Sequence, residues 1–143
     1  MQIILTTLAI CVAFTSAALI ADPELGQDSN GNPLPLNLDN DPMIKWSDTD
    51  PSKSKVYLYL SNFVQFPPEC VSIIKGIDIS PGQYTIPPGA MNCSIRGGPG
   101  YKFRISYEDN QCCGGFEAEN NNAFNVVSYT TSNPASCSSW RCA

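Results

Sequence analysis

The chain has 143 residues, with 13 acidic and 8 basic side chains and no histidine. Its net charge of −5 disfavours nucleic acid as a partner, because phosphate binding needs a basic surface. The lack of histidine excludes serine–histidine and cysteine–histidine catalysis and removes the commonest ligand of catalytic zinc.

Residues 1–18 have the pattern of a secretory signal peptide. An apolar run over residues 3–14 is followed by small residues, and cleavage after Ala17 or after Ala18 satisfies the preference of signal peptidase. The apolar run is too short to span a bilayer, and no later run is long enough. We therefore expect a secreted, extracellular protein without a membrane span.

The next segment, residues 19–54, carries the whole net charge. It holds seven acidic residues and two lysines, which gives −5, and it is rich in proline and asparagine and free of cysteine. This composition predicts a disordered acidic arm ahead of a folded domain at residues 55–143. The oxygens of Asp28, Asn30, Asn32 and Asp39 have calcium-loop spacing, but a proline replaces the required glycine, so no metal is predicted there.

The domain that follows contains six cysteines, an even number that predicts three disulfides in a small exported protein. Zinc is disfavoured because paired Cys-x-x-Cys motifs are absent. Adjacent cysteines on a strand point to opposite faces, so the vicinal pair should bond two different partners. We favour Cys70 with Cys93 and the vicinal pair with the last two cysteines, although spacing leaves other pairings open. The six are Cys70, Cys93, Cys112, Cys113, Cys137 and Cys142.

Short alternating apolar segments separated by proline and glycine turns indicate an all-β fold, and no window has a sustained helical period. The class predicted is a small disulfide-stapled sandwich or Greek-key domain. The stretch Tyr101–Phe116 is the centre of this prediction, with a core strand, a turn and two cysteines. Strands are expected over residues 55–60, 71–79, 83–86, 92–96, 101–107, 116–118 and 124–130.

A short motif resembles the βγ-crystallin Greek key. Tyr107 and Gly114 stand at the aromatic and glycine positions of that motif, with Cys112 in place of its second aromatic residue. The resemblance implies calcium sites in the segments before Ser72 and Ser128. Each segment lacks the first ligand and the final serine, so we predict structural clamps at these serines and no metal or other cofactor.

No catalytic residue is predicted. The carboxylate pairs that remain for glycosidase-like chemistry are Glu108 with Asp109 and Glu117 with Glu119. Residues two apart on a strand share a face, so only the second pair could act together, and surface charges of this kind are commonly only solvated.

Two further residues are candidate modification or ligand sites. Asn92 begins the single glycosylation sequon, Asn-Cys-Ser, in which the central cysteine competes by forming a disulfide. Trp140 lies between the last two cysteines and is either a ligand-stacking residue or part of the core.

The overall organisation, a signal peptide, a polar leader and a compact six-cysteine domain, resembles the small secreted cysteine-rich proteins of filamentous fungi. The resemblance implies a non-enzymatic effector-like or toxin-like protein that binds a host or competitor protein or glycan. Two alternatives remain: a carbohydrate-active or cell-wall-binding protein, with Glu117 and Glu119 or exposed aromatic residues at its site, and a structural protein of the extracellular matrix.

Overall fold

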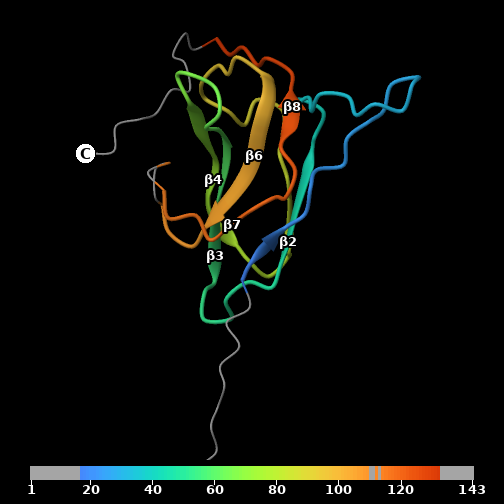
Figure 1. Cartoon of the computed structure of the whole chain (residues 1–143). Coiled ribbons are helices and arrows are strands. Elements are labelled where there is room, and N and C mark those ends of the chain that lie inside the picture. The colour runs from blue at the N-terminus through green and yellow to red at the C-terminus, as the bar shows by residue number, and fades with distance from the viewer. Residues whose placement is uncertain (1–16, 110–111, 113, 133–143) are drawn as a thin grey trace, which may run out of the picture.

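The computed structural model describes residues 17–109, 112 and 114–132 (Figure 1). Within these residues the chain forms β-strands and no helix, so no helix there could cross a membrane. The strands are β1 (Leu19–Ile20), β2 (Met43–Ser47), β3 (Lys55–Asn62), β4 (Glu69–Asp78), β5 (Gln83–Thr85), β6 (Gly98–Ser106), β7 (Ala118–Glu119) and β8 (Phe124–Val126).

The strands form two antiparallel sheets that pack against each other. One has three strands in the order β1-β2-β5, and the other has five, in the order β4-β3-β6-β7 with β8 paired to β6. A single hydrophobic cluster contains buried side chains from both sheets, so the core lies between them. The prediction of an all-β sandwich is confirmed.

The two central strands, β3 and β6, alternate between the core and the opposite face, as their sequences predict. Every second side chain points to the three-stranded sheet, and we call this side of the five-stranded sheet the inner face. The inner-face side chains of β3 and β6 are at most 1% exposed: Val56, Leu58, Leu60, Tyr101, Phe103 and Ile105.

The prediction of a disordered arm over residues 19–54 is wrong. This segment supplies β1 and β2, and Ile44 and Trp46 of β2 are buried in the core. The Trp46 indole donates a hydrogen bond of 3.1 Å to the carbonyl oxygen of Ile79. The prediction relied on the net charge of the whole segment. Within it, β2 alternates buried apolar with exposed side chains and therefore forms a half-buried strand.

Most other strands lie where the sequence predicts them, with shifted ends. The expected strand over residues 92–96 is reduced to bridge positions at Ser94 and Ile95, of which Ile95 pairs with Tyr129. The segment from residue 63 to residue 68, between β3 and β4, is a loop whose Val64 and Phe66 are 81% and 91% exposed. It lies at the same end of the sheet as Pro99, whose carbonyl oxygen accepts a hydrogen bond from the Asn62 amide at 2.7 Å.

Candidate functional site

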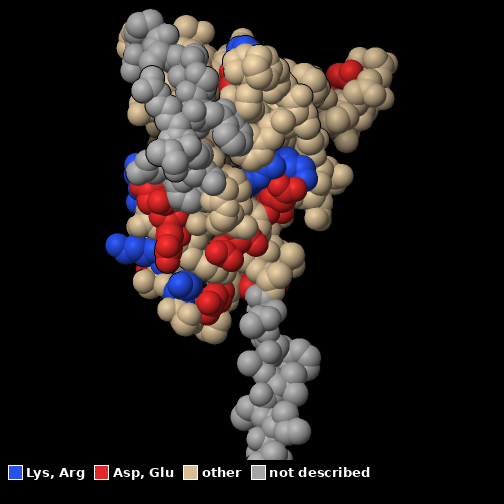
Figure 2. Space-filling model, turned by 60° about the vertical axis from the view of Figure 1, so that its left-hand side comes forward, with Lys and Arg blue, Asp and Glu red and all other residues tan. Residues whose placement is uncertain are grey.

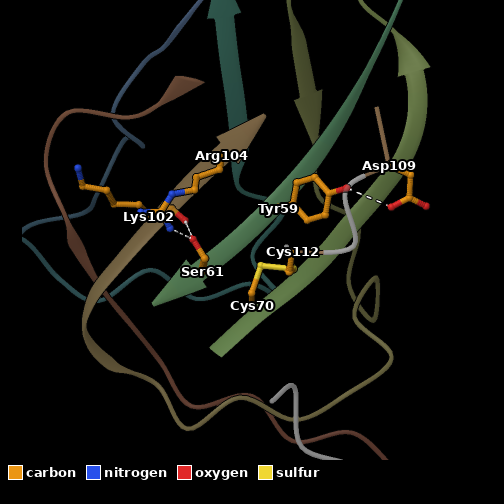
Figure 3. The surroundings of a disulfide bond; sticks show 7 residues. All are labelled: Tyr59, Ser61, Cys70, Lys102, Arg104, Asp109 and Cys112. Carbon is orange, nitrogen blue, oxygen red and sulfur yellow. Dashed lines mark hydrogen bonds between the residues drawn. A yellow bond between two sulfur atoms is a disulfide. The ribbon is translucent and has the colours of Figure 1, made fainter. Parts of the chain in front are cut away.

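The other side of the five-stranded sheet, the outer face, is covered in part by the chain that follows β6. Cys112 in this segment forms a disulfide with Cys70 of β4, with an S–S distance of 2.08 Å (Figure 3). The preferred pairing of Cys70 with Cys93 is therefore wrong. The physical reason is that Cys93 packs against the inner core, whereas Cys70 belongs to a cluster on the outer face. Cys93 is disulfide-bonded as well.

The pairing predicted for the vicinal cysteines is also wrong for Cys112. The remaining predicted disulfide residues, Cys113, Cys137 and Cys142, lie outside the described residues, as does Trp140.

A small apolar cluster forms around this disulfide. Tyr59 of β3 is fully buried in it, and Phe116 packs edge-on against the Tyr59 ring at a centroid distance of 5.4 Å. The Tyr59 hydroxyl donates to Asp109 at 3.2 Å (Figure 3). Asp109 also forms an ion pair of 3.1 Å with Lys75. Asp109 therefore anchors the covering segment to the sheet, which is a structural role.

Arg104 of β6 is the central polar group of the outer face. Its guanidinium carbon lies 4.3 Å from the centroid of the Phe63 ring and 5.5 Å from that of Phe116. The guanidinium also donates to the Ser61 hydroxyl, and it pairs with Glu119 of β7 at 2.7 Å. Cation–π contact and ion pairing together fix the orientation of this side chain, which is 12% exposed.

Glu119 receives a second cation from the same strand. The Lys102 ammonium lies 2.6 Å from one carboxylate oxygen, and Arg104 binds the other. The hydrogen bond from Lys102, helped by that from Arg104, lowers the pKa of Glu119 below its ordinary value, although burial acts in the opposite direction. This carboxylate is therefore ionised at neutral pH and accepts hydrogen bonds, but it has no proton to give as a general acid.

A pocket of about 430 Å³ opens beside these groups. Its lining consists of Ala18, Arg104, Phe116, Glu117, Ala118 and Glu119. The structure thus places Glu117 and Glu119 on one pocket, as their spacing predicts, whereas Asp109 lies in the anchor described above. An aromatic ring beside fixed carboxylate and guanidinium groups can bind a ligand that has an apolar face and several hydroxyl groups. Sequence reasoning missed Arg104 and Phe63, because their contact depends on the pairing of β3 with β6.

A second pocket, of about 350 Å³, lies near the other end of β6 and borders the buried carboxylate of Glu69. Arg96 donates to Glu69 at 2.8 Å, and the Tyr101 hydroxyl donates to the same carboxylate. Burial and this bond raise the pKa of Tyr101 to about 12. Arg96 also donates to the carbonyl oxygens of Phe66 and Pro67, so the cluster holds the 63–68 loop in place.

Three other predicted residues have no role in these pockets. Asn92 is exposed, which suits a glycosylation acceptor. Ser72 is not a clamp, since its buried hydroxyl has no hydrogen-bond partner among the described residues. Asp28 closes a local turn by accepting bonds of 2.8 and 2.9 Å from two backbone amides, and the described residues contain no metal-binding cluster.

The charges around the outer face are mixed. Figure 2 shows Lys and Arg side chains next to Asp and Glu, without a broad patch of either sign. Such a surface gives little attraction to a polyanion and suits a neutral ligand.

Comparison with known proteins identifies the family of the domain. A search of curated proteins and a search of solved structures each gave no match. The model of the Kre9/KNH-like N-terminal Ig-like domain matches residues 37–114, from before β2 to just beyond Cys112. The βγ-crystallin and effector resemblances receive no support from these comparisons. Because the match covers more than half of the sequence and agrees with the two-sheet fold, the chain belongs to the family of the Kre9/KNH-like N-terminal Ig-like domain.

Proposed function

We propose that this protein is a secreted, non-enzymatic component related to the fungal cell wall, and that its outer-face pocket binds a neutral wall polysaccharide. The family match supports the relation to the cell wall and export from the cell. The observation that carries the binding role is the pocket itself, in which the Phe116 ring and the carboxylates of Glu117 and Glu119 border one opening.

Sugar recognition explains why these groups are combined. The apolar face of a pyranose ring packs on an aromatic ring, and its hydroxyl groups bond to planar carboxylate or guanidinium groups that are held in fixed orientations. Arg104 is fixed by Phe63 and by Glu119, so little conformational entropy is lost when a ligand binds.

The pocket favours binding over hydrolysis. Glycosidases of the two-carboxylate kind need one carboxylic acid that keeps its proton. Glu119 has the reverse environment, because Lys102 and Arg104 both stabilise its ionised form. The pair Glu117 and Glu119 is therefore better suited to accepting hydrogen bonds from hydroxyl groups.

The test is retention of the purified domain on insoluble chitin, β-glucan, mannan and cellulose. Phe116→Ala removes the aromatic ring that lines the pocket and should weaken binding roughly three- to tenfold, as expected for the loss of an aromatic contact. Phe66→Ala is the matched control, because Phe66 is 91% exposed and does not line the pocket. Lack of retention of the wild-type protein on all four polymers would overturn the proposal.

An effector-like or toxin-like function is the second candidate. The observation that favours it is the 63–68 loop, which presents Val64 and Phe66 to solvent while Asn62 and Arg96 bond to its backbone. Exposed apolar side chains on a fixed loop are typical of protein interfaces. In this case Phe66→Ala, and not Phe116→Ala, would abolish the response of host tissue or of a competing microbe.

A further inference from the structure

The first strand begins at the predicted signal-peptidase site. Ala17 is exposed, whereas Ala18 is 6% exposed and belongs to the hydrophobic core. Cleavage after Ala18 would remove a buried methyl group from the core of the folded protein. Cleavage after Ala17 keeps the core intact, so the structure distinguishes two sites that the sequence leaves equivalent.

Ala18 also lines the outer-face pocket. β1 is bonded to β2, and an isolated parallel bridge joins Ile20 to Asn120. This bridge brings the start of β1 to the β7 edge, and Ala18 and Ala118 both line the pocket. Ala18 and Glu117 thus border the same opening.

Glu117 is the pocket carboxylate that lacks a partner. Glu119 is bonded to Lys102 and Arg104, whereas the carboxylate of Glu117 has no ion pair or hydrogen bond among the described residues. Lys102 and Arg104, the basic residues beside the pocket, thus both form ion pairs with Glu119. A further cation placed beside Glu117 would be stabilised by it.

We propose that signal peptidase cleaves after Ala17 and that the α-ammonium group of Ala18 then pairs with the Glu117 carboxylate in the pocket. In this step water adds across the Ala17–Ala18 amide. The new carboxylate leaves with residues 1–17, and the amine stays on Ala18 and takes up a proton. The uncleaved amide has no charge, so the pocket acquires this cation only on processing.

The first experiment determines where the mature chain begins. The full chain is expressed in a secreting fungal host, and the N-terminus of the secreted protein is read by intact mass and Edman sequencing. The proposal predicts Ala18 as the first residue. A chain that starts at Leu19, or one secreted with residues 1–17 attached, overturns it.

The second experiment tests the ion pair in the secreted protein. Amines are labelled by reductive ¹³C-methylation, and the pKa of the Ala18 amine is followed by NMR in wild type, Glu117→Gln and Glu108→Gln. An exposed ion pair should raise this pKa by about half a unit, from an ordinary value near 8. Glu117→Gln should return it to the ordinary value. Glu108→Gln removes the same charge at an exposed position outside the pocket and should leave it raised.

Equal pKa values in wild type and Glu117→Gln would contradict the pairing. Neither experiment uses a polysaccharide, although the inference concerns the pocket of the proposed function. A raised pKa without glycan retention would therefore refute only the proposed function, and retention without a raised pKa would refute only this inference.

Discussion

The two faces of the five-stranded sheet are stabilised in different ways. On the inner face, alternate residues of β3 and β6 are aliphatic or aromatic and at most 1% exposed, and close packing holds them, with Tyr101 the member that also donates a hydrogen bond, to Glu69. On the outer face, a disulfide, an aromatic stack and two ion pairs to Glu119 fix individual groups. Because strand residues alternate between faces, neighbours in sequence have different roles. Phe103 is part of the hydrophobic core, whereas Arg104 lines the outer-face pocket.

The largest effect should come from the inner face. Phe103 is fully buried and its ring centroid lies 5.0 Å from that of Phe124. Phe103→Ala should lower the free energy of unfolding by about 3 to 5 kcal/mol, through lost burial and a cavity. The matched outer-face change, Lys102→Ala, should cost less than about 1 kcal/mol, because Lys102 makes an exposed ion pair. Urea denaturation measures both, and similar losses would refute the distinction between faces.

The next effect should come from the Cys70–Cys112 disulfide. It closes a loop with a sequence separation of 42, for which chain entropy predicts a stabilisation of about 4 kcal/mol, an upper limit for a strain-free bond. Replacing both cysteines by alanine should lower stability by about 2 to 4 kcal/mol and expose the apolar cluster around Tyr59. Peptide mapping of the wild-type protein should recover Cys70 linked to Cys112; a Cys70–Cys93 peptide would contradict this account.

A smaller, pH-dependent effect is expected where the N-terminal segment meets the sheet edge. Burial raises the pKa of Asp22, but hydrogen bonds from Asn120 and Asn122 outweigh it and hold the pKa below the ordinary value of 3.8. This stabilisation is present above the unfolded-state pKa and is lost as pH falls through the folded-state pKa. Asp22→Asn should therefore destabilise the protein more at pH 7 than near pH 2. Urea midpoints that differ equally at both pH values would exclude this linkage.

The smallest effect is predicted at Ser72 of β4. Its buried hydroxyl has no partner among the described residues, so the desolvation cost is not offset. Ser72→Ala should leave stability unchanged or raise it by up to about 1 kcal/mol. Thermal unfolding gives the answer, and a clear decrease in Tm would mean that the hydroxyl is bonded after all.

The fold class could be predicted from sequence because it depends on local alternation. The run Lys55–Leu60 and the run Tyr101–Tyr107 each predict a strand with one apolar face, and each forms one. The strands within residues 19–54 were not predicted, because the acidic composition of the segment outweighed the short apolar alternation around Trp46. Composition describes a segment on average, whereas burial is decided residue by residue.

The candidate site was predicted only in part. The spacing of Glu117 and Glu119 was sufficient to place them on one side of a strand. The contact of Arg104 with Phe63 requires β3 and β6 to be paired, and the Cys70–Cys112 bond requires the covering segment to lie on the outer face. Neither long-range pairing has a local signature in the sequence, which is why the predicted Cys70–Cys93 disulfide is wrong.

Binding of a neutral wall polysaccharide in the outer-face pocket can be observed residue by residue by NMR. Soluble oligosaccharides of chitin, β-glucan and mannan are added to the ¹⁵N-labelled mature protein, and backbone amide shifts are followed. If the pocket binds such a sugar, saturable shifts should be confined to Arg104 and the Phe116–Glu119 segment, which line the pocket. Shifts confined to the 63–68 loop, or no shifts with any of the three sugars, would contradict it.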